Sequence, residues 1–441
     1  MKSILIFGAG KSATSLIEYL CTVCDNYHWD LCVCDANLQL AKSKIAGSKK
    51  ATAVSIDVSD DEERISLIQK ADLVISMLPP HLHFLVAQDC VTYLKHLLTA
   101  SYIDEKIKSL EEKIRQKGLI FICELGLDPG IDHMSAMKII DDIRNDGGKI
   151  ISFKSHCGGL IAPESDDNPW HYKITWNPAN VVMAGSSGAL YLEDDKKVQL
   201  EYPDVFDTCT DIDVPGLFPL EGYPNRDSIS YIEKYGLHDA KTFLRTTLRY
   251  PSFCSGWDKI VNMGFTDTAD EEQVKSRKTY SDWYQEKAKL FVSGNTKPRF
   301  ESDLLNEKFI AQIDYLGIRS DESIVPSHTS SAAILQYLLE TKLAMYSHDK
   351  DMIVMVHEIG YLKDGKNKNV VSSMIVKGND QVHTAMAKTV GLPLGIAAKL
   401  IMLGKIKTPG LHIPVSVEIY EPVLAELEEH NIKFNEEITA K

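Results

Sequence analysis

The sequence predicts an α/β protein whose first part is a doubly wound parallel sheet. Three observations predict it: short apolar runs, helical patterns between them, and a glycine-rich turn after the first run. That first run, residues 4–7, has no helical spacing and ends at glycine, which is typical of a buried parallel strand. Further runs of this kind follow at 29–34, 51–56, 73–77, 96–100 and 119–123. Six strands alternating with helices make one complete open sheet.

The turn after the first strand has the spacing of a dinucleotide-binding site. Gly8 permits the tight turn, Gly10 lets the backbone approach a pyrophosphate, and Ala13 lets the following helix pack closely. The start of that helix offers free N–H groups and a partial positive charge to phosphates. The motif therefore predicts a Rossmann-type domain. The alternative is a structural turn that binds no ligand.

Asp35 follows the second predicted strand. A carboxylate at this position accepts hydrogen bonds from ribose hydroxyls and repels a 2′-phosphate. The sequence therefore predicts NAD as the cofactor, with NADP the less favoured one. The alternative is that Asp35 caps the next helix.

The composition bounds the class of protein. The chain has 441 residues, of which 44% are hydrophobic and 25% charged, as in soluble globular proteins of two or three domains. Its net charge of −14 argues against nucleic acid or an anionic membrane as a partner. The chain begins directly with a strand and has no signal-peptide pattern. The apolar stretch 389–403 contains Pro393 and Lys399 and is too short to span a bilayer.

The nine cysteines indicate reduced thiols and a cytoplasmic location, because their number is odd and no secretion signal is present. Two pairs, Cys21 with Cys24 and Cys32 with Cys34, resemble zinc spacing. They fall on a predicted helix and a predicted strand, where small apolar side chains are expected. No metal site is therefore predicted.

The sixth strand ends in a loop, residues 124–132, that glycines and a proline prevent from continuing as a strand. Asp128 lies on this loop, at the edge where substrate and nicotinamide are expected; the alternative is that it caps the next helix. A second region begins with a strand at 150–156. The loop that follows, 157–176, combines glycine and proline with aromatic and acidic residues, which suits a binding loop.

From about residue 215 the pattern becomes more helical. Three of the nine arginines in the chain, Arg226, Arg245 and Arg249, fall close together there. Arginine binds carboxylates through two parallel hydrogen bonds, so this segment predicts a substrate with more than one carboxylate. The alternative is an internal ion pair, such as Arg226 with Asp227.

The rest of the chain completes the prediction. Residues 259–348 are helical and charged, and two strands at 352–361 and 369–377 surround a hairpin turn. A helix from residue 383 and a last helix at 421–430 close the chain.

Taken together, these motifs resemble the glutamate-forming saccharopine dehydrogenases, also called saccharopine reductases. The resemblance covers most of the chain and rests on an ordered set of motifs. They are GAGKSA at 8–13, ADLVISMLP at 71–79, TASY at 99–102, ELGLDPGIDH at 124–133, CGGL at 157–160, APES at 162–165, NPWHYKITW at 168–176, EGYPNRDS at 221–228 and TLRY at 247–250.

The resemblance implies a three-part organisation. A Rossmann domain would comprise 1–130 and about 386–441. A mixed α/β domain for substrate binding and dimerisation would comprise about 131–215 and 349–385. A mostly helical domain, about 216–348, would be inserted between the two parts of the mixed domain. A homodimer is expected.

The resemblance also implies the site residues. Cofactor contacts are expected at Gly8, Gly10, Lys11, Ser12, Ala13, Asp35, Asp57, Val58, Leu78, Thr99, Gly126, Leu127, Asp128, Pro129 and Trp176. Saccharopine contacts are expected at Ser101, Tyr102, Asp128, Arg226, Thr247, Leu248 and Arg249. No general base is evident, and the candidates are Asp128, Tyr102, Cys157 and His156.

Three positions depart from the family pattern. Members that use NADP carry Arg just after the second strand, where this chain has Asp35, so the resemblance also favours NAD. His156 replaces a tyrosine before CGGL, and Ile161 replaces the usual proline of that loop. Neither of the last two changes removes an expected ligand-binding residue.

The sequence therefore predicts an NAD-linked oxidoreductase acting on a CH–NH bond. It would oxidise saccharopine to glutamate and 2-aminoadipate 6-semialdehyde, or catalyse the reverse reduction, in lysine metabolism. Saccharopine carries three carboxylates and two amines, which fits the grouped arginines. One alternative is a related imine-reducing enzyme such as a carboxynorspermidine dehydrogenase. Another is a non-catalytic NAD-binding regulator with the same fold.

Overall fold

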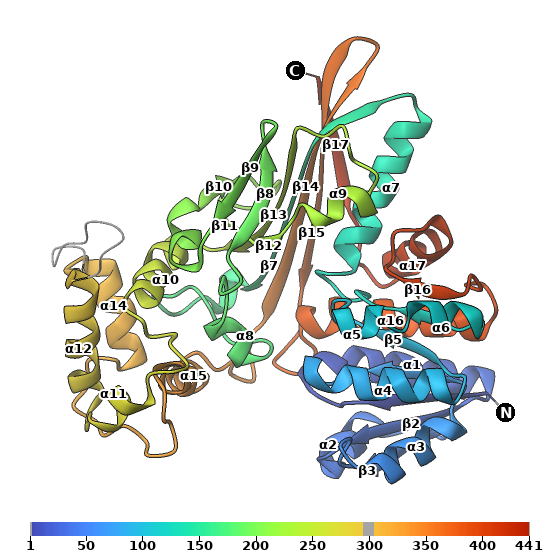
Figure 1. Cartoon of the computed structure of the whole chain (residues 1–441), viewed down its shortest axis with the longest axis horizontal. Coiled ribbons are helices and arrows are strands. Elements are labelled where there is room, and N and C mark those ends of the chain that lie inside the picture. Colours follow the sequence, from blue (N-terminus) through green and yellow to red (C-terminus); the bar gives the residue numbers. More distant parts are fainter. Residues whose placement is uncertain (1, 294–303, 441) are drawn as a thin grey trace. The chain divides into compact units, whose positions relative to one another are not determined.

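The computed structural model describes residues 2–293 and 304–440 (Figure 1). The chain divides into two compact units. The first combines the residues up to Lys149 with Met374–Asn435, and the second combines Ile150–Ser373 with the residues from Glu436 onward. The first unit is therefore built from two distant parts of the sequence. The division into three domains expected from the resemblance stays a prediction.

The first unit contains a seven-stranded sheet in which every pair of neighbours is parallel. Its spatial order is β16-β6-β5-β4-β1-β2-β3. Successive strands are added on one side of β1 up to β3 and on its other side from β4 onward, as in dinucleotide-binding sheets. All six predicted strands are confirmed; the short β16 was not predicted. The strands are β1 (Ser3–Phe7), β2 (Asp30–Asp35), β3 (Ala51–Ser55), β4 (Leu73–Ser76), β5 (His96–Thr99), β6 (Ile120–Ile122) and β16 (Gly410–His412).

Helices connect these strands and pack on the sheet. The helical segment between β5 and β6 consists of two short helices, α5 and α6. The helical elements of this unit are η1 (Lys11–Ala13), α1 (Thr14–Tyr27), α2 (Leu38–Lys44), α3 (Asp61–Lys70), α4 (Pro80–Thr92), α5 (Glu105–Lys108), α6 (Glu111–Gln116), α7 (Ile131–Asn145), α16 (Ala385–Met402) and α17 (Val417–Glu429).

Helix α16 is a core element of the first unit. A Cβ atom on Gly391 would lie 2.8 Å from the backbone nitrogen of Leu16, so glycine permits the close approach of α16 to α1. Of the helices in the described residues, α16 alone is long and apolar enough to cross a membrane, and 83% of it is buried inside the structure. Burial of this kind is typical of a core helix.

The second unit is built on a ten-stranded mixed sheet with the order β10-β11-β13-β7-β14-β15-β17 and with β8, β9 and β12 beside this path. The predicted hairpin is confirmed as β14 and β15. The strands are β7 (Lys149–Ile161), β8 (Ala189–Glu193), β9 (Lys196–Leu200), β10 (Thr210–Ile212), β11 (Leu220–Pro224), β12 (Arg226–Asp227), β13 (Thr242–Arg249), β14 (Asp351–Lys363), β15 (Lys366–Lys377) and β17 (Asn435–Ala440).

The expectation of a mostly helical segment from residue 216 is wrong for its first part. β11 and β13 are strands there, and β13 lies in the interior of the sheet with its residues buried on both faces. A strand buried on both faces shows no alternation of polar and apolar residues, which explains the error. Helices dominate only from Phe253 onward, where they enclose a core that includes Trp170, Trp257 and Trp283.

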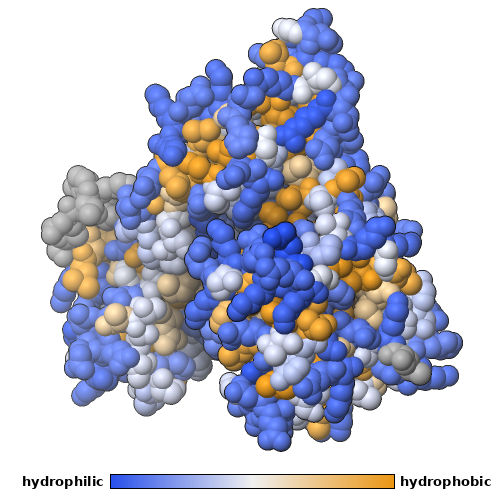
Figure 2. Space-filling view, turned by 45° about the vertical axis from the view of Figure 1, so that its right-hand side comes forward, coloured by the Kyte–Doolittle hydropathy of each residue, from blue (hydrophilic) through white to orange (hydrophobic). Residues whose placement is uncertain are grey.

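The helical elements of the second unit are η2 (Pro163–Ser165), α8 (Pro178–Val182), η3 (Tyr202–Thr208), α9 (Ser230–Lys234), α10 (Phe253–Asn262), α11 (Glu271–Lys275), α12 (Tyr280–Ser293), α14 (Glu307–Leu316) and α15 (Ser331–Lys342). Figure 2 shows one face of the molecule, on which hydrophilic residues predominate and hydrophobic residues gather in small groups.

Candidate functional site

The glycine-rich turn has the geometry that a dinucleotide requires. Gly8 has a φ of +99°, and a Cβ atom there would lie 2.8 Å from the carbonyl oxygen of Met77. Gly10 is different, because no described atom lies within 4 Å of the position that its Cβ would take. The short helix η1 begins directly after Gly10. The first glycine is thus required by the turn, and the second leaves open space beside a helix start, so the residues fit a pyrophosphate.

Asp35 is tied to this turn. One oxygen, Oδ2, accepts a hydrogen bond from the backbone N–H of Ala9 at 2.7 Å. The other, Oδ1, accepts one from the N–H of Asn37 at 2.8 Å. The proposed capping role is wrong, because the side chain of Asn37 caps α2 by accepting from the N–H of Leu40. The carboxylate therefore holds the end of β2 against the glycine-rich turn.

Lys44 lies beside the same turn and was missed by the sequence analysis. Its Nζ donates to the carbonyl oxygen of Gly10 and to the hydroxyl of Thr14, the latter at 2.9 Å. Burial lowers its pKa to about 8, and the charges of Asp35 and Glu18 act in the opposite direction. The only indication in the sequence that Lys44 lies near this turn is its position in the last turn of the helix after β2. A positive charge thus accompanies the Asp35 carboxylate.

The remaining predicted residues of the first unit follow the carboxyl ends of neighbouring parallel strands, so they share one edge of the sheet. Backbone hydrogen bonds join the loops after β5 and β6, from the N–H of Glu124 to Ser101 O at 2.9 Å and from the N–H of Leu125 to Thr99 O at 3.1 Å. Asp128 lies half-buried on the second of these loops. The residues at this edge are Asp57, Val58, Leu78, Thr99, Ser101, Tyr102, Gly126, Leu127, Asp128 and Pro129.

A buried polar network supports the loop that carries Asp128. His133 Nε2 lies 3.0 Å from Glu124 Oε2, and its Nδ1 lies 3.5 Å from Asp132 Oδ2. Asp132 in turn accepts a hydrogen bond from the N–H of Gly130 at 2.6 Å. None of these three residues was among the predicted site residues. Their signal was the presence of four titratable residues in one short motif, 124–133.

In the second unit, two candidate bases, His156 and Cys157, are consecutive residues of β7, so their side chains point to opposite faces of the sheet. Cys157 lies opposite Thr247 in the pairing of these strands, and His156 lies opposite Thr246. His156 Nδ1 is hydrogen-bonded to the hydroxyl of Thr246 at 2.7 Å. Burial lowers the pKa of His156 to about 3, with smaller contributions from Lys154 and His357. This imidazole is therefore neutral at physiological pH and fixed within the sheet.

The three arginines have three different surroundings. Arg226 is exposed and has a φ of 53°. Arg245 is buried, with its guanidinium carbon 4.6 Å from the centre of the Tyr231 ring. Arg249 is also buried, and only 4% of its surface is exposed. The three arginines are close in sequence, but they do not share one environment in the structure.

Arg249 lies in an aromatic cage, which we define by Tyr172, Tyr223 and Phe253. Its guanidinium carbon is 5.2 Å from the rings of Tyr172 and Phe253 and 5.8 Å from that of Tyr223. Its Nη1 donates to the carbonyl oxygen of Leu248 at 2.8 Å, whereas its Nε has no hydrogen-bond partner within residues 2–293 and 304–440. Among the described residues, no carboxylate forms an ion pair with it. A buried cation without a counter-charge is costly, which makes Arg249 a candidate for binding an anionic group.

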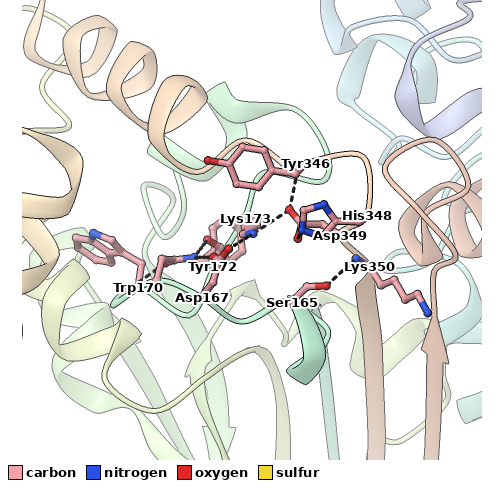
Figure 3. A network of polar contacts seen from close by, with 10 residues as sticks. Ser165, Asp167, Trp170, Tyr172, Lys173, Tyr346, His348, Asp349 and Lys350 are labelled. Atoms are coloured by element: carbon pink, nitrogen blue, oxygen red, sulfur yellow. Dashed lines mark hydrogen bonds and ion pairs between the residues drawn. The ribbon is translucent and has the colours of Figure 1, made fainter.

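The loop that contributes to the cage is anchored by a buried lysine (Figure 3). Lys173 Nζ donates to Asp167 Oδ2 and to Asp349 Oδ2, each at 2.8 Å. Tyr172, next to it in sequence, also accepts a hydrogen bond on its hydroxyl from Trp176 Nε1 at 3.3 Å. Trp176, expected to contact the cofactor, is thus bound to a member of the cage.

Comparison with known proteins agrees with this architecture. Residues 4–122 match the family model described as the saccharopine dehydrogenase NADP binding domain, and residues 126–432 match the saccharopine dehydrogenase C-terminal domain. The saccharopine dehydrogenase [NADP(+), L-glutamate-forming] of Schizosaccharomyces pombe is 31% identical, over 99% of each chain.

Two further relatives extend the comparison. The structure of apo saccharopine dehydrogenase (L-Glu forming) from Saccharomyces cerevisiae covers 100% of both chains, with a TM-score of 0.89 and 31% identity. The mitochondrial alpha-aminoadipic semialdehyde synthase of Rattus norvegicus is 35% identical over all of this chain but only 48% of its own length. The chain thus spans about half the length of the semialdehyde synthases that it matches.

These comparisons correct the prediction that NAD is preferred. The matching domain is described as NADP binding, and fungal relatives are named as NADP(+) enzymes. The physical reason for the error lies in Asp35, whose carboxylate accepts bonds from the backbone of the turn and so has a structural function besides any contact with ribose. The matched models, the full-length relatives and the shared fold show that the chain belongs to the saccharopine dehydrogenase family.

Proposed function

We propose that the chain is a saccharopine dehydrogenase that forms L-glutamate. It would oxidise the CH–NH bond of saccharopine to give glutamate and 2-aminoadipate 6-semialdehyde, or catalyse the reverse reaction, in lysine metabolism. The observation that carries this proposal is the buried Arg249, whose Nε has no partner inside its aromatic cage. The full-length likeness to fungal saccharopine dehydrogenases supports it. The cytoplasmic location and the homodimer stay predictions.

Arg249 would bind one carboxylate of the substrate. Desolvation inside the cage strengthens a charge-assisted hydrogen bond, which contributes roughly 1.5–3 kcal/mol. The exposed Arg226 would bind a second carboxylate. A substrate with three carboxylates thus matches a unit that offers two guanidinium groups, the buried one of Arg249 and the exposed one of Arg226.

In the first unit, Ser101 and Tyr102 would hold polar groups of the substrate, and the carboxylate of Asp128 would attract an amine. The loop joined to the Glu124–His133–Asp132 network would keep Asp128 in position. The bound dinucleotide would supply the acceptor for a hydride. No general base is evident, so the main contribution of the protein to the rate of reaction would be to orient the reacting groups.

We propose that the dinucleotide carries a 2′-phosphate. Lys44 supports this, because its ammonium group lies beside the glycine-rich turn, where it offsets the negative charge of Asp35. Lys11, exposed at the start of η1, adds a second positive charge.

One assay, which follows the absorbance of the reduced nicotinamide, tests both the proposed activity and the proposed cofactor. The purified chain should reduce NADP⁺ when saccharopine is added, with glutamate as a product, and the Lys44→Met variant should lose affinity for NADP⁺ selectively. Lys42→Met, a change at an exposed lysine of the same helix, is the control. Failure of the chain to turn over saccharopine with either dinucleotide would overturn the proposed activity.

A further inference from the structure

A buried histidine links the ends of two strands at the edge that carries the predicted site residues. His83 lies in the first turn of α4, and both of its ring nitrogens are hydrogen-bonded to hydroxyl groups. Nδ1 lies 2.8 Å from Ser76 Oγ, at the end of β4, and Nε2 lies 2.7 Å from Ser101 Oγ, just after β5. His83 was not among the predicted site residues.

The surroundings keep His83 fixed. Only 4% of its surface and 1% of that of Ser76 are exposed, so neither side chain can exchange its partner for bulk water. Ser101 is also held through its backbone, because its N–H donates to the hydroxyl of Thr99 at 3.2 Å. The remaining freedom of Ser101 is therefore the direction of its hydroxyl, and the bond to His83 sets that direction.

We propose that His83 is a positioning residue that holds the Ser101 hydroxyl in the orientation needed to bind the substrate. This inference rests on the proposed function, in which Ser101 contacts saccharopine. His83 itself is too deeply buried to serve as the contact, so it acts through the hydroxyl that it binds.

The charge state of His83 agrees with this role. Burial lowers its pKa to about 4; among the facing groups, Asp104 raises the pKa and His81 lowers it. A neutral imidazole has one donor and one acceptor nitrogen, so one of its two hydroxyl partners receives a hydrogen bond and the other gives one. The direction of the Ser101 hydroxyl is then determined by the tautomer.

Two isosteric variants separate the two hydrogen bonds. In His83→Asn the shorter amide would lie near the position of Nδ1 and keep the bond to Ser76, so this change removes the bond to Ser101. The longer amide in His83→Gln reaches toward the position of Nε2 and keeps that bond. We expect His83→Asn to raise the KM for saccharopine about tenfold, as loss of one hydrogen bond of about 1.4 kcal/mol would, and His83→Gln to change it less than about threefold.

Further measurements distinguish positioning from general damage. Ser101→Ala should raise KM at least as much as His83→Asn, and the double variant should show no loss beyond that of Ser101→Ala, because His83 acts only through the hydroxyl that Ser101→Ala removes. The dissociation constant of the dinucleotide, measured by fluorescence without substrate, should be unchanged in all of these variants. His81→Asn, at an exposed neighbour, is the control.

The outcomes are distinct. A wild-type protein that turns over saccharopine while His83→Asn keeps a normal KM would overturn the positioning role alone. The same holds if His83→Gln loses as much as His83→Asn, or if the His83→Asn and Ser101→Ala effects add. A wild-type protein that does not turn over saccharopine would overturn both this assignment and the proposed function. Nitrogen NMR measures the protonation state of the His83 ring independently of activity. A doubly protonated ring at pH 7 would also contradict the inference.

Discussion

The carboxylate of Asp35 accepts the N–H of Ala9 at 2.7 Å and thereby joins the second strand to the turn that follows the first. The sequence alone suggests that an acid at this position faces a ribose. The structure gives it a bond to the protein itself, so the acid is no longer a simple indicator of cofactor preference.

Asp35→Asn should loosen the glycine-rich turn. An amide has one acceptor oxygen instead of two, so one of the bonds to Ala9 and Asn37 is lost. We expect the free energy of unfolding to fall by about 1–3 kcal/mol and the dissociation constant of the dinucleotide to rise. Urea unfolding and a fluorescence titration measure the two effects.

Asp72→Asn is a matched control for that variant. Asp72 also accepts a backbone N–H, that of Ser3 at 2.8 Å, but at the opposite edge of the sheet. The Asp72→Asn protein should lose some stability and retain full affinity for the dinucleotide. Equal losses of affinity in both variants would contradict a specific role of Asp35 at the turn.

Alanine at Gly8 and at Gly10 should have opposite consequences. Gly8→Ala forces a positive φ on alanine and brings its Cβ to 2.8 Å from Met77 O, so the protein should be strongly destabilised. Gly10→Ala meets open space and should leave the melting temperature nearly unchanged, while its methyl group obstructs the pyrophosphate. Thermal unfolding with and without dinucleotide checks both; a Gly10→Ala protein with normal affinity would contradict the placement of the pyrophosphate.

Much of the first unit could be predicted from the sequence. Its central strands β1 and β4 are apolar runs that are almost entirely buried, and the turn at Gly8 and Gly10 has a fixed spacing with a clear physical purpose. The strand β16 could not be predicted, because three residues, Gly410–His412, carry too little pattern.

The candidate site was less accessible to sequence reasoning. The importance of Arg249 follows from rings that lie far from it in the sequence, such as Tyr172, and no local pattern reports such a contact. The role of His83 likewise depends on Ser76 and Ser101, which reach it from two different strands. Packing between distant segments decides both, so they become visible only in the folded chain.

Arg249→Met should separate stability from function. Removing a buried cation that forms an ion pair with no described carboxylate relieves a desolvation cost, so the melting temperature should stay the same or rise. The KM for saccharopine should increase tenfold or more, because a charge-assisted bond to a carboxylate is lost. Steady-state kinetics with saccharopine as the varied substrate tests this.

Arg245→Met is the control for that change, since Arg245 is a second buried arginine of β13 that packs on a different ring, that of Tyr231. Arg245→Met should raise the KM for saccharopine less than Arg249→Met does. An unchanged KM in Arg249→Met would contradict binding of a carboxylate in the cage.

His156 should make folding sensitive to acid. Its pKa in the folded state, about 3, lies below the value of about 6.5 expected in the unfolded chain. As the pH falls below about 6.5, the unfolded state binds the proton first, so stability is lost progressively toward pH 3.

The variant His156→Gln removes this contribution. The pH dependence of its free energy of unfolding between pH 7 and pH 5 should be shallower than in the wild type, by up to about 1.4 kcal/mol per pH unit. His238→Gln, at an exposed histidine, serves as the control. Identical slopes for the wild type and His156→Gln would show that His156 is not held neutral.

The packing of α16 on α1 has a consequence for biosynthesis. Helix α1 precedes residues 150–373 of the second unit in the chain, yet the helix that covers α1 at Leu16 follows them. A nascent chain released before residue 402 would expose the apolar side of α1 and depend on chaperones. Competence to bind a dinucleotide should therefore emerge late in synthesis.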